Sequence, residues 1–112
     1  MAEKGFYNLH ISFMLGLSMY LGFMPDGETK GELFDLQEGI FREPPIGHQY
    51  WMNEELSGIL RKMLKLDWRN SDQVIITRDQ RQQLLAELIS YYKLHVDGLK
   101  EINAHLILKE VL

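Results

Sequence analysis

Residues 31–50, GELFDLQEGIFREPPIGHQY, form a turn-rich stretch between two long apolar segments that have the pattern of helices. The segments ELFDL and IFRE have alternating apolar residues and flank QEG, so they predict the two short strands of a β-hairpin. Gly39 can adopt the left-handed backbone conformation that a short hairpin loop requires, and Pro44-Pro45 ends the second strand. The chain has no cysteine, so neither a disulfide nor a thiolate zinc site can hold this hairpin.

The segment before the hairpin predicts a helix from about Tyr7 to Gly22. Gly22 and the following Pro25-Asp26-Gly27 end this helix, because proline cannot continue it and Asp-Gly favours a turn. The spacing of the large side chains indicates one apolar face toward the core. This face comprises Leu9, Phe13, Leu17, Tyr20 and Met24, and Met14, Leu21 and Phe23 widen it.

Residues 6–24 contain no Asp, Glu, Lys or Arg, and the segment is close to the length of a membrane span. However, Asn8, His10 and Ser12 interrupt it, and the preceding MAEKG lacks the positive start of a signal peptide. A central helix that is buried on most sides is the better interpretation. A membrane anchor made by this helix is the alternative.

The segment after the hairpin predicts two helices. Asn53 has the character of an N-cap, and the acidic residues Glu54 and Glu55 suit the positive end of the helix dipole. Thr77 and Gln80 in TRDQ form a capping box for the next helix. The apolar stripes are Leu56, Ile59, Leu60, Met63 and Leu64 on the first of these helices, and Leu84, Leu85, Leu88, Ile89, Tyr92 and Val96 on the second.

A last helix is expected from Asn103, with Leu106, Ile107, Val111 and Leu112 facing inward. The sequence therefore predicts a mainly α fold: a compact helical domain of about four helices, with a small β-hairpin insert after the first helix. The length of 112 residues suits one domain. We expect this domain to span residues 1–112.

The chain carries 16 acidic and 12 basic residues, a net charge of −4. A domain that grips nucleic acid alone is usually strongly basic, so this domain is expected to bind nucleic acid weakly or only with help. The absence of cysteine suits a reducing compartment. We therefore expect a cytoplasmic protein.

The four histidines lie in different predicted elements, and no pair has the spacing of a helical metal site. The serines lack a nucleophile elbow, and no glycine-rich phosphate loop is present. We expect no metal, no cofactor and no enzymatic activity. The alternative is a small helical hydrolase that uses His48 or His95 with a nearby carboxylate.

Basic residues gather on the helix after the hairpin. Lysine and arginine near a helix C-terminus are favoured by the helix dipole alone, and this accounts for most such clusters. The functional interpretation is a local positive groove beside apolar residues, which would receive an acidic peptide or a phosphate backbone. The candidate residues are Arg42, Arg61, Lys62, Lys65 and Arg69.

The order of these segments resembles that of a known family. LGFMPD is followed by FDLQEGIF, LSGILRKML, ITRDQRQQLLAELISYYKLHV and LKEINAHLILKEVL. This series is similar to the C-terminal half of RecO, the bacterial recombination mediator, over essentially the whole chain. The resemblance implies a fragment of a longer protein whose N-terminal OB-fold half, the main DNA-binding part, is missing from this sequence.

The resemblance also implies partners. RecO-like proteins bind single-stranded DNA, partner with RecR and act on single-strand-binding protein, whose acidic tail the helical domain captures. Many relatives carry two cysteine pairs that bind zinc in the insert, and these would fall near residues 27–31 and 41–45. No cysteine stands there, so we expect a zinc-less variant whose hairpin is held by the apolar residues Phe34, Leu36, Ile40 and Phe41.

Overall fold

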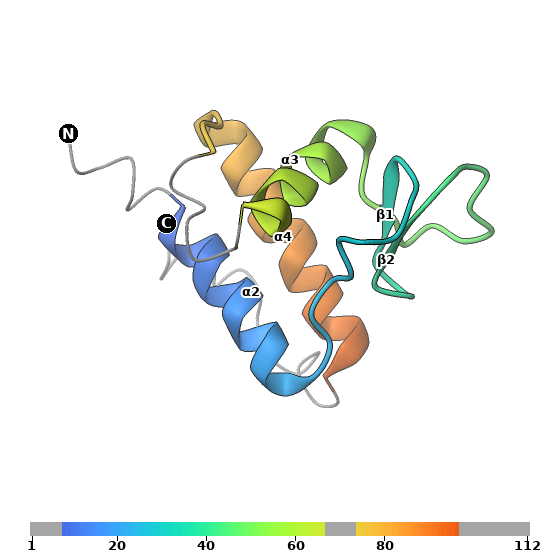
Figure 1. The fold of residues 1–112 in the computed structure, drawn as a ribbon, viewed down its shortest axis with the longest axis horizontal. Coiled ribbons are helices and arrows are strands. Elements are labelled where there is room, and N and C mark those ends of the chain that lie inside the picture. Colours follow the sequence, from blue (N-terminus) through green and yellow to red (C-terminus); the bar gives the residue numbers. More distant parts are fainter. Residues whose placement is uncertain (1–7, 67–73, 97–112) are drawn as a thin grey trace.

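The computed structural model describes residues 8–66 and 74–96. Within these residues it contains three helices and one two-stranded antiparallel sheet (Figure 1). A mainly α fold with a hairpin after the first helix is confirmed, whereas the fourth helix predicted from Asn103 lies outside the described residues. The elements are α2 (Leu9–Leu21), β1 (Leu33–Asp35), β2 (Ile40–Arg42), α3 (Glu54–Lys65) and α4 (Arg78–His95).

Both predicted caps are present at the starts of α3 and α4. The Asn53 side chain accepts a hydrogen bond from the Leu56 N–H at 2.8 Å. Thr77 and Gln80 form the reciprocal capping box. The apolar stripes are also confirmed, because these side chains are buried in one core: Leu56, Ile59, Leu60 and Met63 from α3, and Leu84, Leu85, Leu88, Ile89 and Tyr92 from α4.

Helix α4 is the central element, since it packs against both α2 and α3 (Figure 1). Two tyrosine hydroxyls near its end donate hydrogen bonds to α2 and the residues after it, Tyr92 to the Met14 carbonyl and Tyr91 to the Phe23 carbonyl. Burial raises the pKa of Tyr92 to about 12, so its hydroxyl stays protonated and remains a donor at neutral pH. These bonds fix α2 along the C-terminal half of α4.

The predicted core face of α2 is only partly correct, because Met14, Leu17 and Phe23 pack against the core but the most deeply buried residues of the helix are others. Its buried residues are Ile11, Leu15 and Ser18, whereas Phe13 is 67% and Tyr20 86% exposed. A helix that is apolar on nearly all sides has no strong amphipathic signal, so periodicity could not select the packed face. Ser18 can face inward beside Ile11 and Leu15 because its hydroxyl donates to the Leu15 carbonyl.

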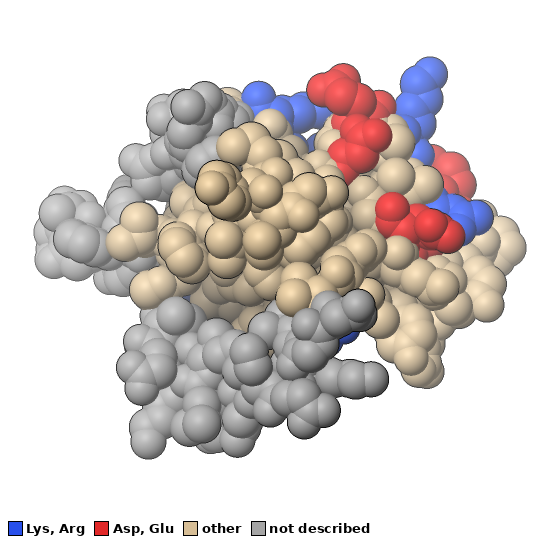
Figure 2. Space-filling view, turned by 90° about the horizontal axis from the view of Figure 1, so that it is seen from below, with Lys and Arg blue, Asp and Glu red and all other residues tan. Residues whose placement is uncertain are grey.

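The outer face of α2 is large and uncharged, and it forms part of the tan surface in Figure 2. The side chains that are at least half exposed are Leu9, Phe13, Met19, Tyr20 and Leu21. Among the helices of the described residues, none combines the length and the apolar character that a membrane span requires.

The hairpin packs on α3 through its apolar face. Phe34 and Phe41 pair across the two strands and are both buried, and Leu36 is buried beside them. The expected apolar attachment is therefore confirmed for these three, while Ile40 is partly exposed. Gly39 has the predicted left-handed conformation, with φ of 73°.

A serine on α3 supplies a polar attachment that the sequence did not reveal. The Ser57 hydroxyl accepts a hydrogen bond from the Phe34 N–H at 2.9 Å and donates to the Met52 carbonyl at 3.0 Å. Both bonds are buried. Ser57 therefore ties β1 and the entry to α3 together in the core.

Gly58 gives a prediction about the stability of α3. This glycine lies in the helix interior and is exposed, and a Cβ there would meet no atom within 4 Å. Gly58→Ala is expected to raise the free energy of unfolding by about 0.5–1 kcal/mol, because alanine loses less backbone entropy in a helix. Urea denaturation measures the change, and a destabilised variant would contradict this account of the site.

Candidate functional site

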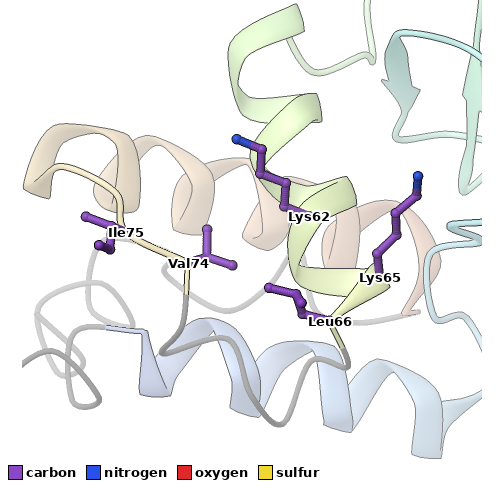
Figure 3. A pocket seen from close by; sticks show the side chains of 5 residues that line it. All are labelled: Lys62, Lys65, Leu66, Val74 and Ile75. Carbon is purple, nitrogen blue, oxygen red and sulfur yellow. The ribbon is translucent and has the colours of Figure 1, made fainter.

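A shallow depression lies between the end of α3 and the segment that leads into α4. Its volume is about 440 Å³, within the range of small-ligand sites. Figure 3 shows apolar side chains on both sides of it and two lysines that rise from α3. The residues that line it are Lys62, Lys65, Leu66, Val74 and Ile75.

The elements that form this depression are fixed by the fold. Lys62 and Lys65 are three residues apart in the last turn of α3, so they lie on the same side of the helix. On the opposite wall, the Asn8 side chain at the start of α2 donates a buried hydrogen bond of 2.8 Å to the Val74 carbonyl. Ile75 follows Val74 and is 79% exposed.

The lining combines apolar surface with positive charge. Leu66, Val74 and Ile75 offer a contact for an apolar group, and the two ammonium groups can pair with carboxylates or phosphates. Among the described residues, no acidic side chain lines it. The depression therefore suits a ligand that is both anionic and apolar.

Arg61 and Arg42 do not line this depression. The Arg61 guanidinium donates to the carbonyls of Thr29 and Gly31 at 3.0 and 2.7 Å, and it stacks 4.1 Å from the centre of the Phe41 ring. Arg61 therefore anchors the hairpin and its preceding loop to α3. One of its terminal nitrogens is held by these two carbonyls and its plane by the Phe41 ring, so it is less available to a ligand than the exposed Lys62.

Arg42 also serves the hairpin, because its guanidinium lies 3.2 Å from the carboxylate of Asp35. Arg69 lies outside the described residues. Of the five basic residues selected from the sequence, the structure thus brings two, Lys62 and Lys65, to one depression.

Asp35 is the centre of a polar cluster at the hairpin. It is fully buried and accepts hydrogen bonds from the backbone N–H groups of Gln37 and Glu38 and from the side chains of Arg42 and His48. Burial alone would raise the pKa of Asp35, but these four donors outweigh it and hold the pKa below the ordinary value of 3.8. The carboxylate is therefore ionised at neutral pH.

His48 and Asp35 form the kind of pair that the hydrolase alternative requires. However, the Nδ1 atom of His48 accepts a hydrogen bond from the Tyr50 N–H at 3.0 Å, and its Nε2 atom lies 3.0 Å from the Asp35 carboxylate. Both ring nitrogens are thus occupied by structural bonds. This arrangement leaves no nitrogen of His48 to accept a proton from a nucleophile.

His95 lies at the edge of the core, beside Phe23 and Tyr91. Its ring stacks on Phe23, and its Nε2 atom is 2.9 Å from the Leu36 carbonyl. Within residues 8–66 and 74–96, no group of three or more His, Cys, Asp or Glu side chains could hold a metal ion.

The roles of Asp35, Ser57 and Arg61 were not predicted from the sequence. An aspartate at the start of a turn often accepts from backbone N–H groups two and three residues on, and DLQEG fits that pattern. This signal could have identified the Asp35 turn. Phe34, whose N–H bonds to Ser57, and the two residues whose carbonyls bond to Arg61 are more than 20 residues away in the chain, so no local pattern points to these contacts.

The chain was compared with known protein families, solved structures and curated proteins. No protein-family model matches the chain, and no solved structure gives a significant match. Among curated proteins, a DNA repair protein RecO from Azobacteroides pseudotrichonymphae is 33% identical over 111 residues, which are 97% of this chain and 46% of that protein.

Two further relatives carry the same name. DNA repair protein RecO of Flavobacterium psychrophilum is 34% identical over 105 residues, and that of Flavobacterium johnsoniae is 37% identical over 106 residues. Each match covers 93% of this chain and 43% of the relative, so the chain spans less than half the length of the relatives it matches. Because these similarities extend over nearly the whole chain and agree on one name, the chain belongs to the RecO family of DNA repair proteins.

Proposed function

We propose that this chain is the C-terminal helical domain of a RecO-like protein and acts in DNA recombination and repair as a non-catalytic binding platform. The family relationship supports a repair role. The occupied ring nitrogens of His48 support a structural rather than catalytic use of the His48–Asp35 pair. A cytoplasmic location, contact with RecR and DNA binding mainly through an N-terminal OB-fold domain belong to this proposal as expectations from the family resemblance.

The ligand of the platform is the acidic tail of single-strand-binding protein, which ends in an apolar residue. The observation that carries this assignment is the placement of Lys62 and Lys65 beside the apolar depression of Leu66, Val74 and Ile75. An apolar terminal side chain would enter the depression, and its carboxylates would meet the ammonium groups. Arg61 is left out of the site because it bonds to the backbone of residues 29 and 31.

A peptide titration tests the site. The probe is a fluorescent acidic peptide that ends in phenylalanine, and its anisotropy is measured as protein is added. Lys62→Glu with Lys65→Glu is expected to weaken binding about tenfold or more, because two attractive charges become repulsive. Rising salt should weaken binding to the unmodified protein as well, since both lysines are exposed.

The matched control is Arg78→Glu with Lys93→Glu, which makes the same change in net charge on exposed residues of α4. This control should bind the peptide almost as well as the unmodified protein. Equal losses in the two double variants would show a general charge effect and remove the assignment of the site. An acidic peptide ending in serine separates the apolar contribution from the charge.

A further inference from the structure

The wall of the depression that faces the two lysines is a short segment without regular secondary structure, residues 74–76. Val74 is only 8% exposed and Ile76 packs against the core, whereas Ile75 between them is exposed. Side chains that alternate in this way are typical of an extended backbone. Ile75 is thereby turned outward, and Figure 3 shows it on the side of Val74 away from Leu66.

This wall is held at both of its ends. On one side, Thr77 and Gln80 form the capping box that begins α4. On the other side, the Val74 carbonyl accepts the hydrogen bond of 2.8 Å from the Asn8 side chain, which is 66 residues away in the chain. Ile75 therefore lies between a local anchor and an anchor that comes from the start of α2.

Asn8 is itself well fixed. It is only 3% exposed, and its carbonyl accepts the Ser12 N–H at 3.0 Å in the first turn of α2. The Tyr92 hydroxyl in turn joins α2 to α4. A buried hydrogen bond meets little competition from water, so the bond from Asn8 transfers the fixed position of α2 to the backbone beside Ile75.

A fixed wall matters for the binding of an apolar group. A single exposed isoleucine is ordinary on a protein surface, but a side chain whose backbone is already ordered gives a larger net gain on contact, because less entropy is lost. Lys62 and Lys65 do not need this support, since they belong to the last turn of α3. The charged and apolar parts of the depression are thus held by different elements.

We propose that Asn8 is a positioning residue that fixes Ile75, and that Ile75 is the side chain with which the depression selects a ligand with an apolar end. Asn8 acts through the Val74 carbonyl and does not touch the ligand. The choice of ligand rests on the proposed function, whereas the support of Ile75 by Asn8 depends on the hydrogen bond and the burial described above.

The test compares two fluorescent acidic peptides that differ only in their last residue, phenylalanine or serine. The ratio of their dissociation constants, measured by anisotropy, is the discrimination for an apolar end. Ile75→Ala is expected to lower this discrimination about three- to tenfold, because apolar contact is lost. Asn8→Ala should lower it several-fold. Both variants should keep the salt dependence of binding, since the two lysines remain.

A double-mutant cycle shows whether Asn8 acts through Ile75. In the Asn8→Ala background, Ile75→Ala should change the discrimination little, and fully additive effects would overturn the proposal. The matched control is Ser18→Ala, which removes another buried hydrogen bond of α2 and should leave the discrimination unchanged. An equal loss in this control would also overturn the proposal. If Asn8→Ala does not fold, Asn8→Leu removes the same donor while filling its space, and the same loss is expected.

A measurement without peptide separates this inference from the proposed function. The order parameter of the Ile75 methyl groups, measured by NMR, should be lower in Asn8→Ala than in the unmodified protein and in Ser18→Ala. If this decrease occurs but the unmodified protein binds neither peptide, the proposed ligand is wrong and the positioning by Asn8 stands. If the peptides bind but the order parameter is the same in all three proteins, the positioning role is wrong and the proposed ligand stands.

Discussion

Asp35→Ala is expected to lower the free energy of unfolding by about 2–4 kcal/mol, because it removes several charge-assisted hydrogen bonds at once while Arg42 stays partly exposed to water. The substitution removes the acceptor of four hydrogen bonds at the hairpin. Two backbone N–H groups in the turn then lose their partner, and the side chains of Arg42 and His48 lose their shared anion. Urea denaturation followed by circular dichroism measures the loss.

Asp35→Asn is the control that separates the contribution of the carboxylate charge from that of the side-chain size and its hydrogen-bond acceptor. The asparagine oxygen can still accept from the turn N–H groups, so we expect a smaller loss than for alanine. A change below about 1 kcal/mol for Asp35→Ala, comparable to that of an ordinary surface substitution, would contradict the role of Asp35 as the centre of the hairpin cluster.

The same cluster predicts a dependence of stability on pH. The pKa of Asp35 is lower in the folded protein than its ordinary value of 3.8, so the unfolded chain binds the proton more readily. The stabilisation is therefore complete above about pH 5 and is lost as the pH falls through 3.8 and below. The difference in unfolding free energy between the unmodified protein and Asp35→Asn should shrink over this acid range, and a constant difference would exclude the proposed ionised state.

Gly31→Ala is the second substitution with a large expected effect. Gly31 has φ of 138°, and an added Cβ would lie only 2.4 Å from the backbone carbonyl carbon of Arg42. The obstacle is backbone, which cannot move aside as a flexible side chain does. Because Gly31 and Arg61 are also joined by a hydrogen bond, a shift of this loop would disturb its anchor on α3. We expect a loss of more than about 2 kcal/mol, as for other strained backbone sites.

Gly47→Ala is the matched control for Gly31→Ala. It lies in the same hairpin region, but a Cβ there would meet no atom within 4 Å, and its φ is not in the left-handed range. We expect little change or a slight stabilisation through the unfolded state. Equal effects of the two alanines would show that the close approach between residues 31 and 42 does not limit stability.

Local patterns predicted the helices α3 and α4 well because their signals agree with one another. Each has an N-cap residue and a stripe of apolar residues at helical spacing, and Asn53 and Thr77 make the expected bonds. Helix α2 has neither a side-chain cap bond nor a distinct polar face. The presence of this helix was therefore predictable from its apolar content. Which of its faces is buried depends on its packing against α4 and could not be predicted from the sequence.

The candidate site was predictable only in part, because local spacing places residues on one helix but does not show which of them contact distant segments. Charge placement grouped Lys62 with Lys65, and both line one depression because residues three apart share one side of a helix. The same rule grouped Arg61 with them, since it is adjacent in sequence. Its bonds to Thr29 and Gly31 and its contact with Phe41 depend on where the hairpin folds back, which only the tertiary structure determines.

The guanidinium of Arg61 has a consequence for the hairpin under chemical stress. It joins the loop before β1 to α3 through carbonyl groups of the chain itself, and the chain has no thiol that an oxidant could modify at this junction. None of these bonds needs a metal ion or a thiol. The attachment of the loop before β1 to α3 is therefore expected to persist under zinc starvation or peroxide stress.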